Sequence, residues 1–261
     1  MDNIMKITPD ITRITVPYED IYTTVCVIRT PEGAVLFDTA SYDSDVPEYI
    51  LPALDALGVQ DLKYIVISHN HGDHSGGLNK LAIHFPEAKI VSLHPSIAKQ
   101  YGNRVLSPKD GEKLLNVLSV ITIPGHAADA IALLDTRTGT LLSGDSLQVY
   151  GIYGSGKWGA NIHLPVEHLV ALKKLHTLPI KTILASHDYQ PYGYLAQGED
   201  AVAAYINGCK QALIDIKSFM CSHPDLDDIA LESAYIAETG LPAVGSHVFA
   251  AMRTVADSGV L

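Results

Sequence analysis

The chain has 261 residues, with 18 Lys and Arg against 29 Asp and Glu, and a formal net charge of −11 at pH 7. Because 47% of the residues are hydrophobic and 18% are charged, the chain can bury a core without disulfides or a structural metal. The acidic balance, without any cluster of Lys and Arg, argues against nucleic-acid partners.

The spacing of the cysteines and the length of the apolar runs indicate the cellular compartment of the protein. Cys26, Cys209 and Cys221 show no CxxC spacing, which favours a reducing compartment over a disulfide framework. The sequence does not begin with a basic segment and an apolar core, and no apolar run approaches the roughly 20 residues that span a bilayer. We therefore expect a cytoplasmic protein without membrane contact.

Short, β-branched apolar runs that end in polar turns predict strands in the first half of the chain. These strands are expected at residues 23–28, 34–37, 64–67, 89–93 and 118–123. Helical patterns at 46–57 and 77–85 lie between them and end at Gly58 and Pro86. The alternation of strands and helices predicts an α/β fold.

Further along, strands are expected at 141–142 and 182–185, with a loop rich in Gly and Tyr at 150–161 and a helix at 165–176. From residue 199 onward the strand patterns stop. Helices are expected at about 200–220, 225–238 and 247–257, with Ser246 as a cap and Gly240 as a helix end. This part of the chain has nine acidic and three basic residues, so we expect an appendage for packing or homodimer formation rather than for DNA binding.

Four of the predicted strand ends follow two shared patterns. Residues 63–70 and 181–188 each form a short apolar run that delivers a histidine at its C-terminal end. Residues 35–38 and 141–145 deliver an aspartate in the same way. Because ligand and catalytic groups gather where the strands of α/β sheets end, we expect these four strand ends to build one site.

The segment 68–74 holds three histidines and an aspartate within six positions, directly after a predicted strand. Imidazole nitrogens and carboxylate oxygens are ligands for zinc or a related divalent ion. Alternation in an extended turn sends His69 and His71 to one side, whereas Asp73 and His74 enter the next helix and can point to a second position. One loop therefore predicts ligands for two metal ions.

A loop that gives two ligands to each ion leaves both ions unsaturated, so later strand ends must supply more. His126 follows the strand at 118–123, Asp145 follows 141–142 and His187 follows 182–185. We expect one site of His69, His71 and His126 and a second of Asp73, His74 and His187, with Asp145 bridging the two.

The HxHxDH run, followed by Pro-Gly-His, Gly-Asp and a final strand-end histidine, resembles the metallo-β-lactamase superfamily over roughly residues 10–190. The resemblance implies an αββα four-layer sandwich, with a catalytic domain at 1–198 and a helical extension at 199–261. It also suggests that Asp38, after the strand at 34–37, orients the ligand loop.

Asp145 as a bridge resembles the glyoxalase II, lactonase and RNase Z branches rather than the true β-lactamases. The segments 154–158 and 187–189 resemble glyoxalase II, which suggests Lys157 and Tyr189 as substrate contacts. Three features of the sequence differ from what particular branches of the superfamily carry. Ala-Ala-Asp follows His126, and the tail is poor in the basic residues that would bind glutathione; Gln148 stands where acyl-homoserine lactonases carry a tyrosine.

The resemblance and the ligand set together predict a hydrolase with two divalent ions, zinc first and manganese or iron as alternatives. A hydroxide bridging the ions would attack a small thioester or lactone, with Asp73 helping to stabilise or protonate the leaving group. The alternatives are a small-molecule phosphodiesterase, a di-iron redox protein and a non-catalytic metal-binding protein. The other seven histidines, expected to serve the surface or the packing, are His84, His94, His163, His168, His176, His223 and His247.

Overall fold

The computed structural model describes residues 3–258. The chain divides into two compact units, Met1–Ile121 and Thr122–Leu261. This division differs from the predicted domain boundary after residue 198, which stays a prediction.

The first unit is built on a seven-stranded sheet whose strand order follows the chain order. Its strands are β1 (Ile4–Lys6), β2 (Ile11–Tyr18), β3 (Ile21–Thr30), β4 (Gly33–Phe37), β5 (Tyr64–Val66), β6 (Lys89–Val91) and β7 (Val105–Leu106). Strands β1 to β4 pair antiparallel, and β4 to β7 pair parallel. The parallel half creates the row of strand ends on which the predicted ligand loop depends.

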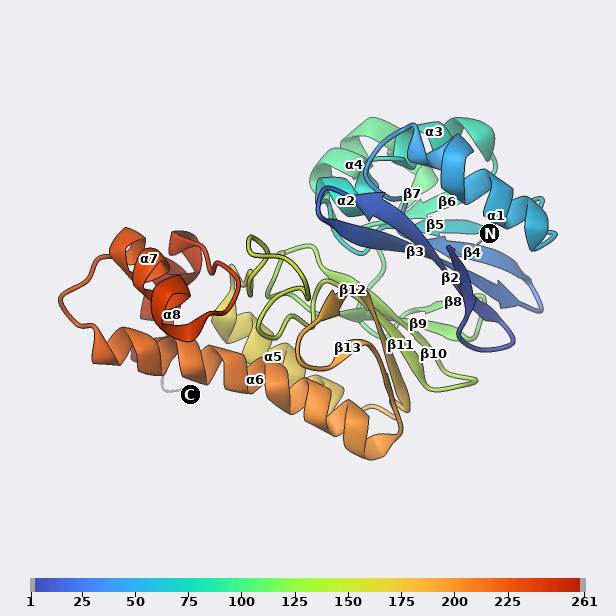
Figure 1. Cartoon of the computed structure of the whole chain (residues 1–261). Helices are drawn as coiled ribbons and strands as arrows, with labels where there is room; N and C mark the ends of the chain where they lie inside the picture. The colour runs from blue at the N-terminus through green and yellow to red at the C-terminus, as the bar shows by residue number, and fades with distance from the viewer. Residues whose placement is uncertain (1–2, 259–261) are drawn as a thin grey trace. The chain divides into compact units, whose positions relative to one another are not determined.

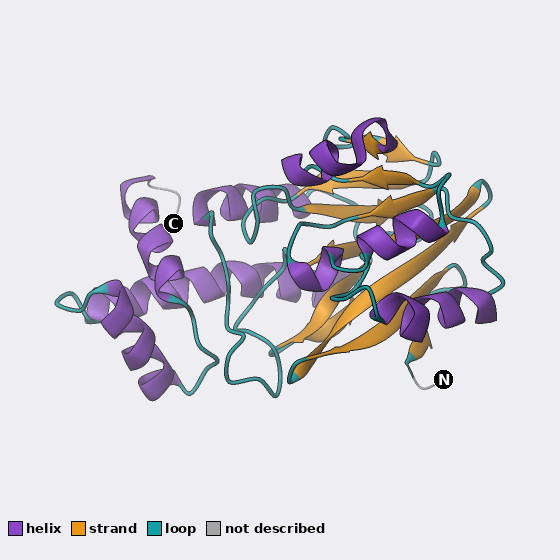
Figure 2. Cartoon of the chain, turned by 90° about the horizontal axis from the view of Figure 1, so that it is seen from above, coloured by secondary structure: helices purple, strands orange, loops and turns teal. Residues whose placement is uncertain are grey.

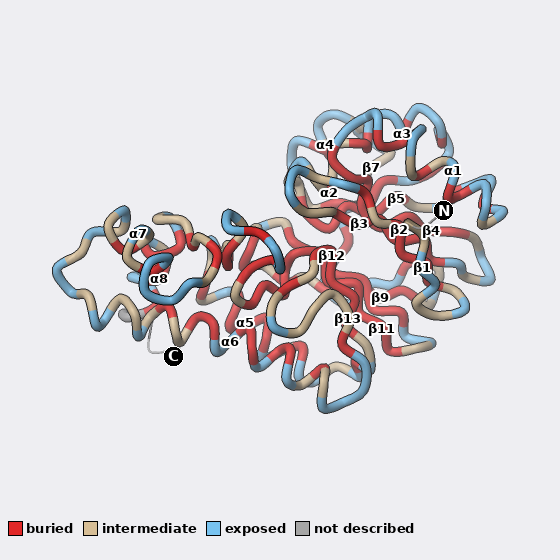
Figure 3. The backbone as a smooth tube through the Cα atoms, viewed as in Figure 1, coloured by how far each residue is buried: buried red, intermediate tan, exposed pale blue. Residues whose placement is uncertain are grey.

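Helices form the crossovers between the parallel strands, as parallel pairing requires. They are η1 (Val46–Ile50), α1 (Leu51–Ala56), α2 (Gly72–Ser75), α3 (Leu78–His84), α4 (Pro95–Tyr101) and η2 (Gly102–Arg104). Apolar side chains from the sheet, such as Leu36 and Ile65, share one core with Ile50 and Leu81 of the helices. Most residues of β2, β3 and β4 are buried, whereas the helices of this unit carry stretches of exposed residues (Figure 3).

The second sheet has six strands in the order β13-β12-β11-β10-β9-β8. They are β8 (Lys113–Leu114), β9 (Leu118–Thr122), β10 (Ile131–Asp135), β11 (Thr140–Gly144), β12 (Thr182–Tyr189) and β13 (Gly193–Gln197). Strands β11 and β12 are parallel neighbours, joined through α5 (Pro165–Leu175), whereas β12 and β13 are antiparallel. The crossover brings the end of β11 beside the middle of β12.

The C-terminal part of the second unit is helical, as the sequence predicted (Figure 2). It contains α6 (Glu199–Ser222), α7 (Asp228–Thr239) and α8 (Ser246–Ser258), with α7 and α8 at the C-terminal end of α6 (Figure 1). A core of its own joins α6 to α7 and α8 through Ile216, Tyr235 and Phe249. Within residues 3–258, none of the helices combines the length and the apolar character that crossing a membrane requires.

The predicted strands and helices are confirmed within a few residues, but several elements were not predicted. These are β1, β2, β7, β8, β10, β13 and α4. Strand β2 carries a buried Arg13 and a proline, Pro17, which both obscure the pattern of a strand. All five residues of β10 are buried, so the strand shows none of the alternation that marks a half-buried one.

Backbone lies directly on backbone where the chain leaves α2. A Cβ atom on Gly76 would stand 1.8 Å from the carbonyl oxygen of Ser41, and one on Gly77 would stand 2.3 Å from that of Thr39. The Gly76 amide donates to the carbonyl of Ala40 at 3.0 Å. The segment after β4 and the end of the histidine-rich loop are therefore held together with no room for a side chain.

We expect Gly76→Ala to lower the free energy of unfolding by at least about 2 kcal/mol, because the added methyl group must displace backbone atoms. Gly72→Ala is the matched control at the start of the same helix, since a Cβ there meets nothing within 4 Å. It should change the stability by less than about 1 kcal/mol. Urea unfolding followed by circular dichroism measures both, and equal stabilities for the two variants would contradict the close packing.

Candidate metal centre

In the first unit, the ends of the parallel strands β4 and β5 place Asp38 beside Ser68. Phe37 pairs with Val66 in the sheet, so the residues that follow each strand are neighbours. The carboxylate of Asp38 accepts hydrogen bonds from the amide of Ser68 at 2.7 Å and from its hydroxyl at 2.9 Å. The start of the histidine-rich loop is therefore fixed by the aspartate of the neighbouring strand.

Asp38 also fixes a histidine of the loop. Its Oδ2 lies 2.8 Å from Nδ1 of His74, and both side chains have no exposed surface. Burial raises the pKa of Asp38, and the contacts with His74 and Ser68 oppose that rise. The backbone of Asp38 has a φ of +64°, a left-handed conformation that Asp and Asn tolerate better than most residues. With its Nδ1–H directed at Asp38, the His74 ring presents Nε2 on its other side.

The rest of the loop is held by its main chain while its ring nitrogens converge. The hydroxyls of Thr23 and Thr39 donate to the carbonyls of Asp73 and His74, each at 2.9 Å. Nε2 of His69 lies 3.0 Å from Nδ1 of His71, and Nε2 of His74 lies 3.3 Å from Oδ2 of Asp73. Potential ligand atoms thus face one another within the loop.

In the second unit, the parallel strands β11 and β12 repeat the arrangement with an aspartate and a histidine. Gly144 pairs with Ala185 after an irregularity in the register, so Asp145 lies beside the part of β12 that carries His187. Oδ1 of Asp145 is 3.4 Å from Nε2 of His187, and Oδ2 is 3.8 Å from Nε2 of His126. One carboxylate therefore directs an oxygen at each of two imidazoles.

The ring of His126 is oriented from behind by the loop that precedes α5. Its Nδ1 lies 2.6 Å from the carbonyl oxygen of Asn161, which only accepts, and 2.9 Å from Nε2 of Gln148, which only donates. Because the contact with the carbonyl is the shorter of the two, we assign the ring proton to Nδ1. Oε1 of Gln148 accepts from the main-chain amide of Asn161 at 2.6 Å. This leaves Nε2 of His126 without a proton on the side of Asp145.

A second histidine, His168 of α5, lies under the turn that carries His126. A Cβ on Gly125 would stand 2.5 Å from Nδ1 of His168, so this ring packs on the bare glycine backbone. Burial, followed by the neighbouring His126, lowers the pKa of His168 to about 4. Its Nε2 has no hydrogen-bond partner among the described residues. His168 is thus a neutral packing residue, within the surface or packing role that the sequence predicted.

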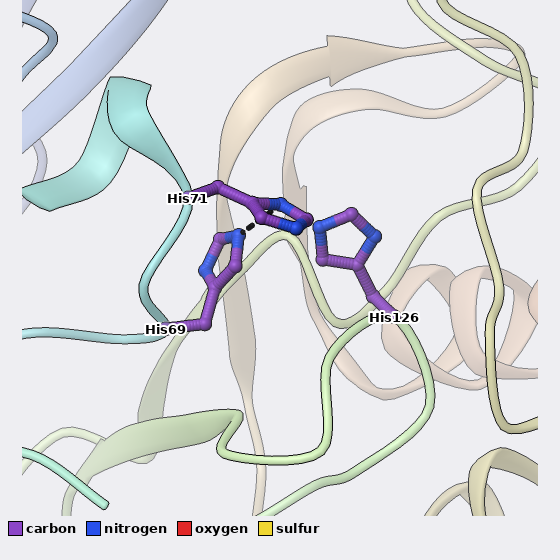
Figure 4. A group of neighbouring side chains, drawn as sticks. All are labelled: His69, His71 and His126. Carbon is purple, nitrogen blue, oxygen red and sulfur yellow. Dashed lines mark hydrogen bonds between the residues drawn. The ribbon is translucent and has the colours of Figure 1, made fainter. Parts of the chain in front are cut away.

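The predicted ligands come together in two groups. His69, His71 and His126 form the first, and Asp73, His74, Asp145 and His187 form the second. Within each group the potential ligand atoms all lie within 4.8 Å of one another, and Figure 4 shows the three rings of the first group. Apart from His71 and Asp73, every member is buried.

The chemistry of these atoms fits a metal ion. In His74 and in His126, Nδ1 faces an oxygen that only accepts, so Nε2 of a neutral ring is an acceptor. That Nε2 faces a carboxylate oxygen, at 3.3 Å and 3.8 Å respectively. Two facing acceptors need a positive charge between them. A divalent ion supplies it and uses three or four converging ligands, whereas a proton serves only two.

The two predicted substrate residues differ in how far they are exposed to solvent. Lys157 is exposed and lines a hollow of about 180 Å³ together with Glu232 and His247. Tyr189 is 1% exposed at the end of β12, with its ring edge-on to His187 at 5.9 Å between centroids. The burial of Tyr189 points to packing against His187, a predicted ligand. Contact with a substrate stays a prediction for both residues.

Some residues that shape the site were not predicted for that role. Ser68, Gln148 and Asn161 orient the loop and His126 through hydrogen bonds. The only signal for Ser68 is its place directly before His69, shared by Ser186 before His187. Gln148 and Asn161 lie in an irregular loop, where no periodicity marks the residues that contact one another.

The sequence model of the metallo-beta-lactamase superfamily matches residues 19–187, well over half of the chain. The chain belongs to this superfamily. The matched range begins before the first strand end of the site and closes on His187, so it contains all seven converging side chains. The predicted family is thereby confirmed.

The relatives that the chain resembles include proteins named as hydrolases. The chain is 31% identical over 134 residues to an uncharacterized protein, YobT, of Bacillus subtilis, which covers 42% of this chain and 57% of that protein. It is 33% identical over 135 residues to a hydroxyacylglutathione hydrolase of Francisella tularensis, covering 49% and 50%. A hydroxyacylglutathione hydrolase of Synechococcus is 26% identical over 234 residues, covering 88% and 81%. The chain spans about half the length of the first two relatives.

Solved metallo-β-lactamases share the fold. The enzyme from Hirschia baltica has a TM-score of 0.59 at 18% identity, covering 79% of this chain and 96% of its own. The enzyme from Pontibacter korlensis has a TM-score of 0.59 at 20% identity, covering 78% and 98%. Together with the two mixed sheets, these similarities confirm the predicted α/β metallo-β-lactamase fold with its helical C-terminal region.

We expect Asp38→Asn to weaken binding of a divalent ion by between about tenfold and a hundredfold, because the carboxylate that orients His74 is lost. Asn keeps the shape and tolerates the left-handed backbone, so thermal unfolding should change little by comparison. Competition with a chromophoric chelator measures the affinity for zinc. Unchanged affinity in a folded Asp38→Asn variant would remove this role from Asp38.

The buried His168 predicts a dependence of stability on pH. Its folded pKa of about 4 lies below the ordinary value of 6.5, so between these values the unfolded chain binds a proton that the folded chain does not. The free energy of unfolding should therefore fall as pH decreases through this window, by up to about 1.4 kcal/mol per pH unit from this group. In metal-free protein, His168→Leu should flatten the slope measured by urea unfolding. His176→Gln, an exposed histidine at the end of the same helix, should keep it.

Proposed function

We propose that this chain is a metal-dependent hydrolase that holds two divalent ions with the seven converging side chains. The observation that carries the proposal is the pair of ligand groups, His69, His71 and His126 in one, and Asp73, His74, Asp145 and His187 in the other. Both groups contain imidazole nitrogens whose tautomer is set by an acceptor behind the ring. The mixture of nitrogen and carboxylate ligands favours zinc, with manganese or iron as alternatives.

When bound, the two ions would supply a water activated near neutral pH and a charge that polarises a carbonyl group. The residues of the chain arrange the rest. Asp145 directs one oxygen at His126 and the other at His187, which suits a carboxylate shared between the two ions. Asp73 keeps a partly exposed carboxylate, 3.3 Å from Nε2 of His74, and we assign to it the handling of a proton for the leaving group.

The substrate we propose is a small molecule with an ester-type bond, and a thioester first. Support comes from the relatives named hydroxyacylglutathione hydrolase, since an acyl-glutathione is a thioester. The Ala-Ala-Asp after His126 and the acidic tail speak against glutathione itself as the thiol. A lactone is the second substrate class, and a small phosphodiester is the alternative that the same ligand set allows.

The partner predictions belong to the same proposal. A small-molecule substrate agrees with the acidic surface, which disfavours nucleic acid. A homodimer through the helices after residue 199 and a cytoplasmic location remain predictions.

The test combines metal content with turnover. Purified protein should hold about two divalent ions per chain by elemental analysis and should hydrolyse thioesters or lactones within a panel that also contains phosphodiesters and β-lactams. Chelation should abolish turnover and zinc should restore it. Asp145→Ala should lose metal and turnover together, since the shared carboxylate is removed.

Asp135→Ala is the matched control, a buried carboxylate of the same sheet that pairs with Arg137 at 2.7 Å instead of with histidines. It should keep its metal and its turnover even where its stability falls. Full activity of metal-poor Asp145→Ala protein would refute the proposal. Metal binding without turnover across the panel would favour a non-catalytic metal-binding protein, and iron at full occupancy would favour redox chemistry.

A further inference from the structure

The helices α6, α7 and α8 form a helical tail. Through His247, the second residue of α8, this tail contacts Asn161, which lies behind the predicted ligand His126. Nε2 of His247 lies 2.6 Å from the side-chain oxygen of Asn161, so the ring donates to that oxygen. The ring also stacks on His163, with centroids 4.5 Å apart and planes 21° apart. On another side it packs on Gly245, where a Cβ would stand 2.7 Å from the ring. His247 is therefore held in one orientation.

Asn161 connects this ring to a predicted metal ligand. Its side chain accepts from His247, and its own main-chain carbonyl lies 2.6 Å from Nδ1 of His126. Its main-chain amide donates to Oε1 of Gln148, whose Nε2 lies 2.9 Å from Nδ1 of His126. The three residues therefore form one small network. The position of one carbonyl oxygen, and with it the tautomer and tilt of His126, thus depends on how Asn161 is held.

Helix α8 gives His247 a rigid base. The next two residues, Val248 and Phe249, have no exposed surface and lie in the core shared by α6, α7 and α8. The loop itself is tied to the tail by main-chain bonds, from Gly159 to Ala243 at 3.0 Å and from Ala243 to Gly156 at 3.2 Å. These bonds keep the loop in place without His247, so the histidine acts on Asn161 and not on the loop as a whole.

We infer that His247 is a positioning residue for the metal centre, through which the helical tail sets the orientation of His126. The inference rests on the proposed function, because it concerns the ion held by His69, His71 and His126. Loss of the His247 ring removes the contact that holds the Asn161 side chain, so the residue can shift together with the main-chain carbonyl that fixes His126. The ion of the other group, with Asp73 and His74, does not depend on this contact.

The test is the zinc affinity of the full chain, measured by chelator competition that separates two binding events. His247→Ala should weaken one event by about tenfold, the lower end of the effect for residues that orient ligands, and leave the other unchanged. Asn161→Ala should do the same. The double variant should be no weaker than either single variant, because both break one connection. His247→Gln, which keeps an N–H donor, should recover most of the affinity.

Two controls separate positioning from the stability of the tail. His223→Ala removes another tail histidine, which pairs with Glu238 at 2.9 Å. Val248→Ala loosens the core directly beside His247. Both should keep the affinity of the wild type, even where Val248→Ala lowers the melting temperature.

The outcomes distinguish this inference from the proposed function. Wild-type protein that binds no zinc refutes the proposed function and the inference with it. Wild-type protein that binds two ions, with His247→Ala and Asn161→Ala equal to it, refutes the inference alone. Loss of affinity in Val248→Ala equal to that in His247→Ala would also overturn it, because general loosening of the tail would then explain both.

Discussion

The constraint on which the site depends is the pairing of parallel strands whose ends carry polar residues. β4 ends beside the end of β5, which places Asp38 next to the segment that follows β5. β11 ends beside the middle of β12, which places Asp145 next to the part of β12 that carries His187. The two aspartates contact different nitrogen atoms of the imidazole rings beside them. Asp38 contacts Nδ1 of His74, whereas Asp145 lies on the Nε2 side of His126 and His187. The pairing of parallel strands thus supplies both a residue that orients an imidazole and the carboxylate that we propose as a shared ligand.

Electrostatics explains why a carboxylate on the Nε2 side of an imidazole favours a bound metal ion. A neutral imidazole whose proton is committed to an acceptor offers a lone pair on its other nitrogen, and in this protein that lone pair meets a carboxylate. Buried acceptors facing each other repel, and the repulsion is strong because little water screens it. A divalent cation turns the same arrangement into a favourable one, so the orientation of the rings and the affinity for metal have a common origin.

The parts of the site that the sequence predicted are those tied to strand ends. His69, Asp145 and His187 follow short apolar runs, a local pattern that fixes their position along the chain, and the order of the parallel strands then gathers them. Asn161 and His247 could not be predicted in this way. They are 86 residues apart, and their contact depends on how an irregular loop packs on the start of α8. The domain boundary after residue 198, predicted where the strand patterns stop, stays a prediction; the two compact units divide between Ile121 and Thr122.

The bare backbone contact at Gly76 also limits how this protein can diverge. Where two segments touch through main-chain atoms alone, no side-chain substitution can adjust their separation by small steps. We therefore expect related chains either to keep the distance between the segment after β4 and the histidine-rich loop or to lose this contact. Changes in specificity must then accumulate elsewhere in the chain. The loop at 150–161 and the segment after residue 199 also meet through side chains, such as Asn161 and His247, which selection can vary one at a time.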